Sequence, residues 1–252
     1  MNKIFTFTVV ALFAVCWIGC SDDDNDDSPK RKLVSKVHEY WDDNEYEEWK
    51  FIYNDDASIK TAIHTVKESY HMSIDTMHVQ HFNDKVIIRE IETSDYDNWQ
   101  PDESTVSFIL DNQKRIVEYT LHSYEPIYFQ YSDEGQLIYS SYMEQKFKWS
   151  DGNIINSSYV GYITPSDIEN KTNIDLNPII VSYFSMEGES YKVALNDYWG
   201  TRSKNLIQKT QDRSQQREFK YIIDEDGDPV KVLEIEEDGS ESHYIEITYT
   251  YQ

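Results

Sequence analysis

Residues 219–230 read Phe219-Lys220-Tyr221-Ile222-Ile223-Asp224-Glu225-Asp226-Gly227-Asp228-Pro229-Val230. In this stretch an aromatic–x–aromatic segment is followed by a turn rich in Asp and Gly, and then by an aliphatic residue that opens a new segment. Asp-Gly and Asn-rich turns accept positive φ and so favour β-hairpins. The stretch therefore predicts two antiparallel strands joined by a tight turn.

The same unit recurs along the chain at irregular spacing, which predicts a meander of hairpins and not a strict solenoid. A weaker copy is Phe108-Ile109-Leu110 with Ile116, and Glu237-Asp238-Gly239 makes one more turn before the last strand. The full copies are Phe51-Ile52-Tyr53 with Asn54-Asp55-Asp56 and Ile59, Phe129-Gln130-Tyr131 with Asp133-Glu134-Gly135 and Leu137, and Phe147-Lys148-Trp149 with Asp151-Gly152 and Ile154.

Composition and alternation support a sheet. The chain has 20 Tyr, 10 Phe and 6 Trp but only 8 Gly and 6 Pro, and aromatic side chains pack well on a pleated surface. Within 244–251, Ile245, Ile247 and Tyr249 share one face, and Glu246 and Thr248 share the other. Such period-2 alternation predicts a half-buried antiparallel sheet, so we expect a mainly β protein.

One stretch, 161–216, lacks clear alternation and is predicted to be a helical insertion. Asn177-Pro178 is a good helix start leading into 179–184, and a second short helix is expected over 189–198 with Gly200 as its stop. Because strands resume at Glu218, we expect the insertion to cover part of the sheet of one β-rich domain, 33–252.

The N-terminus predicts export and lipid attachment. Lys3 is the only charged residue before an apolar run, 4–18, that is too short to span a bilayer. Trp17-Ile18-Gly19-Cys20 resembles a lipobox, so 1–19 is predicted to be a lipoprotein signal peptide and Cys20 the site of lipid attachment. The alternative is a plain signal peptide in which Cys20 is incidental.

Residues 20–32 are predicted to be an acidic, flexible tether. An acidic stretch directly after the lipidated cysteine resembles the export tag of Bacteroidetes lipoproteins displayed on the outer face of the outer membrane. This resemblance implies an outer-membrane, cell-surface location with the membrane as a partner through Cys20. The alternative is an acidic spacer on a lipoprotein that faces the periplasm.

Charge and cysteine content restrict the partners. The net charge is −24, with 47 acidic residues against 23 basic ones, and such a field repels nucleic acid and anionic lipid. We therefore expect no nucleic-acid partner. Cys16 leaves with the signal peptide and Cys20 carries lipid, so the domain, which we expect to be monomeric, has no disulfide.

Several motifs further along resemble the Bacteroidetes lipoprotein family known as domain of unknown function 4595. They are Thr172-Asn173-Ile174-Asp175-Leu176-Asn177, Tyr198-Trp199-Gly200, Ser203-Lys204-Asn205-Leu206 and the tyrosine-rich last strand. The resemblance implies a porin-like fold: a strongly curved antiparallel sheet or an open barrel, with a short helical insertion. It implies no activity, so no catalytic residue is carried over.

Four polar residues in these motifs, Asp175, Asn177, Ser203 and Asn205, are candidate ligand contacts. Polar residues in connecting segments more often cap helices and hold turns, and we favour that structural role.

Two groups of residues are weak metal candidates. His71, His78 and His81 lie within eleven residues, but in a strand His78 and His81 point to opposite faces, which disfavours zinc. The run 224–228 is acidic like a calcium loop, yet the first and last ligand places of an EF-hand hold Ile222 and Leu233. We predict an ordinary hairpin turn and no metal or cofactor.

Trp41, Trp99 and Trp199 stand beside Asp or Asn in expected loops. Indole rings at such places can stack on a sugar or anchor a protein partner. The alternative, which we favour for each, is a ring folded back over the end of the aromatic core.

The sequence does not fix a function. It lacks a Gly-rich phosphate loop and a Gly-x-Ser-x-Gly elbow, and with 47 acids no catalytic carboxylate pair can be nominated. The favoured hypothesis is a non-enzymatic envelope module that binds a glycan, a peptide or an envelope protein. The alternatives are a hydrolase and a carrier of an apolar ligand in a concavity of the sheet.

Overall fold

The computed structural model describes residues 30–252 except 43, 97–98, 122–124, 182–189, 213–214 and 237. Met1–Lys30 and Arg31–Gln252 form separate units, and every described strand belongs to the second. The predicted signal peptide and Cys20 lie outside the described residues. No helix in the described part of the chain is both long enough and apolar enough to cross a membrane.

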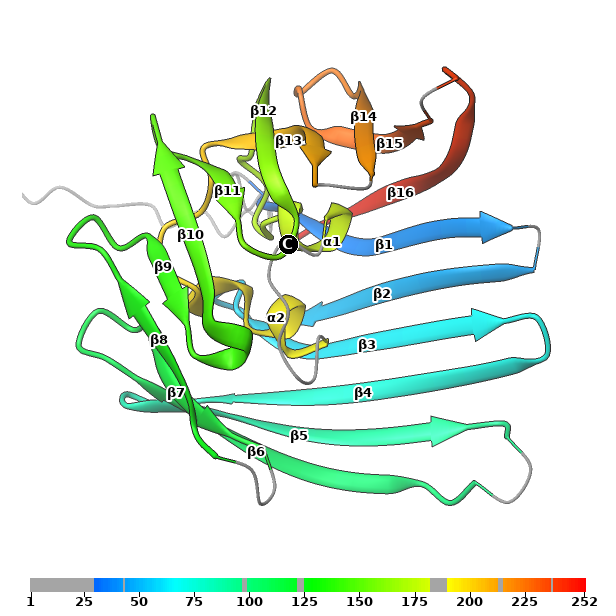
Figure 1. Cartoon of the computed structure of the whole chain (residues 1–252). Helices are drawn as coiled ribbons and strands as arrows, with labels where there is room; N and C mark the ends of the chain where they lie inside the picture. The colour runs from blue at the N-terminus through cyan, green and yellow to red at the C-terminus, as the bar shows by residue number, and fades with distance from the viewer. Residues whose placement is uncertain are drawn as a thin grey trace, which may run out of the picture. The chain divides into compact units, whose positions relative to one another are not determined.

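The described residues form sixteen strands, each antiparallel to the next along the chain (Figure 1). β16 also pairs with β1, from Lys32↔Tyr251 to Tyr40↔Tyr244, and this closes the barrel. The predicted mainly β, antiparallel fold is confirmed, and closure removes the exposed sheet edges. The strands are β1 Lys32–Asp42, β2 Glu45–Tyr53, β3 Ile59–Glu68, β4 His71–His81, β5 Lys85–Ser94, β6 Asp102–Leu110, β7 Ile116–Thr120, β8 Ile127–Tyr131, β9 Leu137–Ser140, β10 Gln145–Ser150, β11 Asn153–Ser157, β12 Gly161–Glu169, β13 Asn205–Gln211, β14 Gln216–Ile223, β15 Pro229–Ile235 and β16 Glu241–Tyr251.

Each predicted aromatic unit forms a hairpin, namely β2–β3, β6–β7, β8–β9, β10–β11 and β14–β15. In an antiparallel meander, turns that follow even-numbered strands lie at one end of the barrel, which we call the turn end. The turns that follow odd-numbered strands lie at the opposite, open end. The repeated sequence motif therefore marks one end of the barrel.

At the turn end, the second aromatic of a unit donates a hydrogen bond to a backbone carbonyl of the preceding strand. Tyr131 Oη donates to Ile116 O (2.8 Å), and Trp149 Nε1 donates to Leu137 O (2.8 Å). The bonds that follow this pattern also include Tyr53 to Val34, Tyr221 to Ile207 and Tyr249 to Pro229. Each ties an aromatic side chain to the strand before it, for about 0.5–1.5 kcal/mol of net stability.

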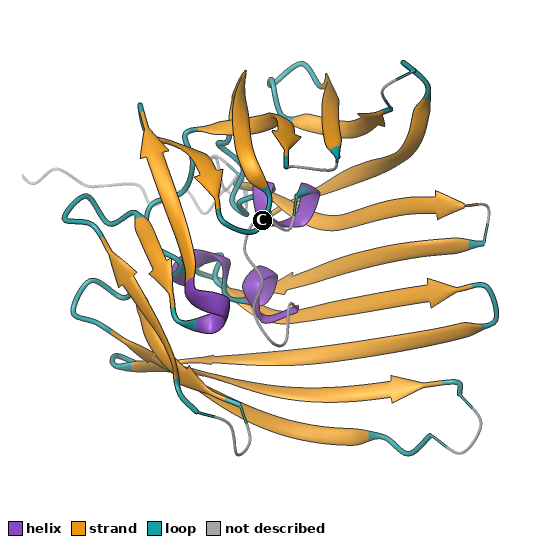
Figure 2. Cartoon of the chain, viewed as in Figure 1, coloured by secondary structure: helices purple, strands orange, loops and turns teal. Residues whose placement is uncertain are grey.

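The helical segment lies inside the barrel and not over its outside (Figure 2). It contains α1 Asn177–Ile180, α2 Ser190–Ala194 and the 3-10 helix η2 Asn196–Tyr198; a further 3-10 turn, η1 Tyr142–Glu144, joins β9 to β10. Tyr191 packs edge-on against Phe108 (centroids 5.6 Å apart), and Trp199 packs edge-on against Phe129 (5.1 Å). We call residues 170–204, except 182–189, the plug.

The predicted insertion, 161–216, was too wide, because its two ends form β12 and β13. The alternation of β12 was hard to recognise because Pro165 stands inside the strand and the pairing with β13 shifts register on either side of it. The predicted helix start at Asn177-Pro178 corresponds to α1, but α1 ends at Ile180 with Val181 extended, and 182–184 of the predicted helix lie outside the described residues. The helix predicted over 189–198 corresponds to α2 with η2; residue 189 is not described.

A side chain of the plug forms hydrogen bonds with backbone groups of the barrel wall. The buried Asn177 donates from Nδ2 to Asn205 O (3.0 Å) and accepts at Oδ1 from Ile207 N (2.9 Å). Gly200 has φ +80°, and a Cβ there would lie 2.3 Å from the carbonyl oxygen of Gly135. Glycine is therefore required where the plug touches the β8–β9 turn.

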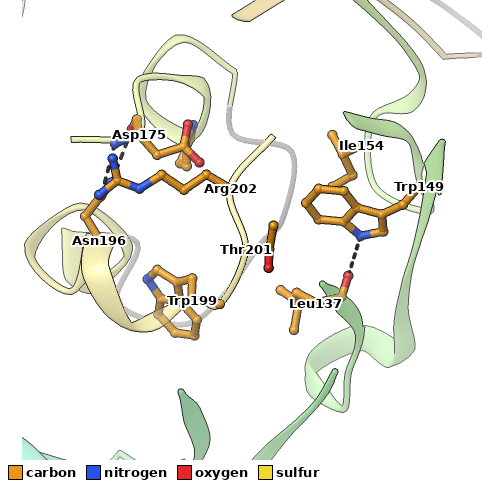
Figure 3. Close-up of a pocket in the computed structure, with 10 residues that line it drawn as sticks. Leu137, Trp149, Ile154, Asp175, Asn196, Trp199, Thr201 and Arg202 are labelled. Atoms are coloured by element: carbon orange, nitrogen blue, oxygen red, sulfur yellow. Dashed lines mark hydrogen bonds between the residues drawn. The ribbon is translucent and has the colours of Figure 1, made fainter. Parts of the chain in front are cut away.

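A small cavity of about 20 Å³ remains between plug and wall, lined by Trp149 and Trp199 among others (Figure 3). It has room for about one water molecule. Next to it, Asp175 N donates to Asn196 Oδ1 (2.9 Å). Around this cavity the described part of the turn end is thus closely packed.

Candidate functional site: an acidic cup inside the barrel

Toward the open end, acidic residues replace apolar ones on the inner face of the barrel. Alternate side chains of a strand point to the same face. On β2, Glu47 therefore shares the inner face with the buried Trp49 and Phe51, and on β4, Asp75 shares it with the buried Met77. Glu90 on β5 also faces inward. Five other inward-facing acids of the first strands, which we call the acidic row, are Glu39 on β1, Glu47 on β2, Asp75 on β4, Glu92 on β5 and Asp102 on β6.

The register brings like charges face to face. Glu39 pairs directly with Glu47, and Glu92 pairs with both Asp75 and Asp102. Directly opposed like charges destabilise a sheet. Burial, together with the charges of Asp75, Glu90 and Asp102, raises the pKa of Glu92. The like charges around Glu92 therefore oppose folding stability, and such conflicts concentrate at functional sites.

A cavity of about 310 Å³, which we call the cup, lies between this wall and the plug. Its volume falls within the range of small-ligand sites. The strands contribute Glu39, Trp41, Glu47, Trp49, His64 and Arg217, and the plug contributes Pro178, Ile179, Ile180, Ser190, Lys192 and Val193.

His64 on β3 stands between two acids of the row. Its Nε2 lies 3.0 Å from Glu47 Oε1 and its Nδ1 lies 3.4 Å from Asp75 Oδ2. Burial alone would lower the pKa of His64, but the hydrogen bonds with Asp75 and Glu47 outweigh it and raise the pKa to about 9. His64 is therefore an imidazolium at neutral pH, and its ring stacks on Trp49 (centroids 4.1 Å apart, 15° between planes).

Two carboxyls near His64, those of Glu47 and Glu90, have opposite pKa shifts. Burial would raise the pKa of Glu47, but hydrogen bonds from His64 and Trp49 hold it below its usual value. Burial raises the pKa of Glu90, which accepts hydrogen bonds from Tyr191 Oη and from Ser104 Oγ (3.3 Å). One wall thus holds both an ionised carboxylate and a carboxyl that retains its proton to higher pH.

Two cations border the cup close to acids of the row: Arg217 interacts with Glu39 and Lys192 with Glu47. Arg217 on β14 donates two hydrogen bonds to the buried Glu234, at 2.6 and 2.5 Å. Lys192 on α2 is buried, and its charge contributes to the lowered pKa of Glu47. Carboxylates still outnumber cations around the cup and the acidic row, so the field there favours positive charge.

The predicted polar residues of the plug motifs have structural roles. Asp175 Oδ1 accepts hydrogen bonds from Asn170 Nδ2 (2.7 Å) and Asn177 N (3.0 Å), and burial raises the pKa of this carboxyl. Ser203 Oγ accepts from Ile154 N (3.1 Å), and Asn205 accepts from Asn153 Nδ2 (3.1 Å). All four hold the plug in place; Asp175 lines only the small cavity at the turn end.

The three histidines do not converge on one point. On β4, His78 faces outward and lies 3.3 Å from Thr61 Oγ1, whereas His81 faces inward and lies 2.6 Å from Tyr198 Oη. His71 stacks on Tyr96 at the open end. The predicted opposite orientation of His78 and His81 is confirmed.

In the acidic turn, the side chains of Asp224, Asp226 and Asp228 gather within 4.8 Å of one another. The ammonium of Lys32 lies among them, at 2.5, 2.9 and 3.0 Å. Lys32 thus supplies the positive charge at the predicted hairpin turn between β14 and β15.

The three tryptophans differ. Trp199 folds back onto the core and donates from Nε1 to Lys192 O (3.0 Å), as favoured from the sequence. Trp99 lies at the open end and is 39% exposed. Trp41 is 38% exposed and lines the cup, so this indole is available to a ligand.

Sequence reasoning missed Glu47, His64, Asp75, Glu90 and Arg217. A usable signal was present, since Glu47 continues the inward parity of Trp49, Phe51 and Tyr53. With 47 acidic residues in the chain, this alternation identifies Glu47 as a site residue only once the register of the strands is known.

No family model and no curated protein matches this chain, so membership of the domain of unknown function 4595 family stays a prediction. Among solved structures, the chain is similar to a porin-like protein from Bacteroides uniformis (TM-score 0.51, 13% identity, covering 89% of this chain and 99% of that one). It also matches a porin-like protein from Bacteroides vulgatus (TM-score 0.38, 11% identity, 87% and 99% covered). At this identity, the first match shows that the two proteins share a barrel fold.

Proposed function

We propose that this protein is a non-enzymatic, lipid-anchored barrel of the cell envelope whose cup binds a small, positively charged solute. The observation that carries the proposal is the direct pairing of Glu39 with Glu47 and of Glu92 with Asp75 and Asp102. His64, Lys192 and Arg217 offset part of this negative charge. A bound cation would offset more of it, and the 310 Å³ cup, which Glu39 and Glu47 line, gives it a place to bind.

The charged side chains on the outer wall favour a barrel whose outer surface is exposed to water. Lys50 on β2 is 56% exposed, and Arg89 and Glu103, paired across β5 and β6, are 50% and 55% exposed. A charged side chain facing lipid costs about 2–4 kcal/mol at the bilayer midplane. These charges fit a barrel held to the membrane by lipid on Cys20 better than one embedded in it.

For location, we propose the outer membrane with the barrel displayed at the cell surface; a periplasm-facing barrel is the alternative. Labelling with radioactive palmitate tests the anchor, because Cys20→Ser should remove the label. Protease treatment of intact cells distinguishes the two locations, since only a surface barrel is cleaved before the cells are lysed.

Calorimetric titration of the full chain in mild detergent tests the cup. Spermidine and arginine amide should bind, more weakly as salt rises, whereas citrate and glucose should not. The double variant Glu39→Gln/Glu47→Gln should weaken cation binding at least tenfold, about 1.4 kcal/mol. The control Glu103→Gln removes an acid from the outer wall and should change affinity little. Equal losses in both variants, or preferential binding of citrate, would overturn the proposal.

A second function has one observation in its favour. Catalysis by two carboxyls requires one proton donor and one ionised partner, and Glu90 and Glu47 have pKa values shifted in those two directions. If the protein is a glycoside hydrolase, it should cleave oligosaccharides and Glu90→Gln should abolish cleavage. The carrier hypothesis gains no support, because the plug fills the apolar end of the barrel and charged groups line the cup.

A further inference from the structure

A second hollow lies on the outer wall, on strands remote in sequence from the acidic row. Its centre is a row of side chains that pair across four strands: Lys148 on β10 with Asn156 on β11, Asn156 with Tyr162 on β12, and Tyr162 with Gln211 on β13. The neighbouring Phe147 and Ile163 are buried in the core. Since side chains alternate along a strand, the row faces outward.

This row forms part of an open groove of about 890 Å³. Tyr159, on the turn between β11 and β12, and Tyr162 are 49% and 73% exposed. Two other outer tyrosines are covered by neighbours: Tyr40 stacks on Tyr244 with centroids 4.5 Å apart, and Lys231 lies 3.7 Å from the centroid of the Tyr244 ring. In the described part of the chain, the rings of Tyr159 and Tyr162 have no such partner. Tyr128 on β8 is exposed like the groove tyrosines, at 48%, but it lies outside the groove.

The groove is built on a fixed backbone. Gly161 has φ +75°, and a Cβ there would lie 2.4 Å from the carbonyl oxygen of Gln211, so only glycine allows β12 to approach β13 this closely. Asn156 Nδ2 donates to the carbonyl oxygen of Gly161 (2.9 Å). The hairpin that carries both tyrosines is therefore held against its neighbours before any ligand arrives.

The chemistry of the groove indicates its ligand. A tyrosine ring offers a flat apolar face together with a polar hydroxyl, which suits the C–H face of a pyranose ring. Asn156, Gln211 and Ser158 offer hydrogen-bonding groups for sugar hydroxyls. Of the described lining residues, Lys148 is basic and Asp212 is acidic, so this lining favours neither strongly anionic nor strongly cationic chains.

We propose that this outer groove binds a neutral oligosaccharide, with Tyr162 and Tyr159 stacking on its sugar rings. The site lies on the outside of the barrel wall and does not depend on what the cup binds. A nucleic-acid strand is disfavoured because, among the described residues, Lys148 alone supplies positive charge to the groove lining, and the protein carries a net charge of −24.

An array of neutral glucan, mannan, galactan and N-acetylglucosamine oligosaccharides, probed with the full chain, tests the proposal. At least one should bind, and calorimetry with the best of them should show roughly tenfold weaker binding for Tyr162→Ala. The matched control is Tyr70→Ala, which removes a 90% exposed tyrosine at the open end and should leave affinity unchanged.

Two results would overturn the proposal. One is the absence of binding to any of these oligosaccharides while thermal unfolding confirms that the chain is folded. The other is glycan binding that survives Tyr162→Ala and Tyr159→Ala but is lost in the cup variant Glu39→Gln/Glu47→Gln. Binding lost only in the two groove variants, with an unchanged melting temperature, supports the groove.

Discussion

The imidazole Nε2 of His64 lies 3.0 Å from a carboxylate oxygen of Glu47, while the indole of Trp49 donates to the same carboxylate at 3.0 Å and stacks on the imidazole ring. Three neighbouring inward-facing side chains of β2 and β3 thus form one interlocked group. The group holds a charged histidine at the wall of the cup, and its stability must depend on pH.

Stability should fall as pH rises through the titration of His64. The pKa of this group is about 9 in the folded protein and about 6.5 in the unfolded chain, so its stabilisation is full below pH 6.5 and lost as pH passes 9. The free energy of unfolding should drop by at most about 3 kcal/mol over that window. Urea titrations at pH 6, 7.5 and 9 measure the slope. His64→Gln should flatten it, and His78→Gln, on the outer face, should not.

Removing the hydroxyl of Tyr53 should destabilise the barrel. Its Oη donates to Val34 O and accepts from Asn173 Nδ2 at 2.9 Å, linking β1, β2 and the plug. Tyr53→Phe leaves both partners unsatisfied and should cost about 1–3 kcal/mol, measured by chemical denaturation. Tyr128→Phe, which alters a tyrosine 48% exposed on β8, should change stability by less than about 0.5 kcal/mol. Equal effects would mean that the turn-end hydrogen bonds contribute nothing.

Asn177 should be among the most sensitive polar positions. Asn177→Ala leaves the carbonyl of Asn205 and the amide of Ile207 without their partner inside the barrel. Each unsatisfied group costs about 1–3 kcal/mol, so the midpoint of unfolding should fall clearly. Asn112→Ala, in the exposed β6–β7 turn, is the control. An unaltered midpoint for Asn177→Ala would show that the plug is not held at this point.

Substitutions at two glycines should distinguish the cost of backbone strain from the cost of steric overlap. Gly200 and Gly239 have similar φ values, +80° and +85°, but a Cβ at Gly200 meets Gly135 O at 2.3 Å and a Cβ at Gly239 meets nothing within 4 Å. Gly239→Ala should cost about 1 kcal/mol for the left-handed backbone alone. Gly200→Ala should cost that amount plus the overlap, and hydrogen exchange should show an opened contact between plug and β8–β9 turn. If both variants lose the same stability, the close approach at Gly200 is relaxed at no cost.

The hairpins were predictable because their information is local. Asp224-Glu225-Asp226-Gly227 specifies a turn within a few residues, and the strand on either side follows from its alternation. Closure of the barrel was not predictable, because it depends on Lys32 meeting Tyr251 across the length of the domain. Likewise, alternation shows that a strand has two faces but does not place the plug inside the barrel.

The candidate site was harder to predict for a different reason. Glu47 is one of many acids, and only its parity with Trp49 and Phe51 distinguishes it from the outward-facing Glu48. Asp75 and Glu92 face one another only after β4 and β5 are aligned. Arg217 comes from β14, so its place at the cup depends on closure itself. Because the residues of the site come from strands that are far apart in sequence, they form no contiguous sequence motif.

The pairing of β1 with β16 has a kinetic consequence. β1 pairs with β2 on one side and with β16, the strand farthest from it in sequence, on the other, so this second pairing cannot form until the whole domain has been made. Contacts of this kind slow folding, because chain entropy is lost before they form. Until β1 and β16 pair, each leaves one unpaired strand edge exposed to other chains. A protein with this topology should depend on chaperones while it folds, and a shortened chain lacking β16 should aggregate rather than merely lose stability.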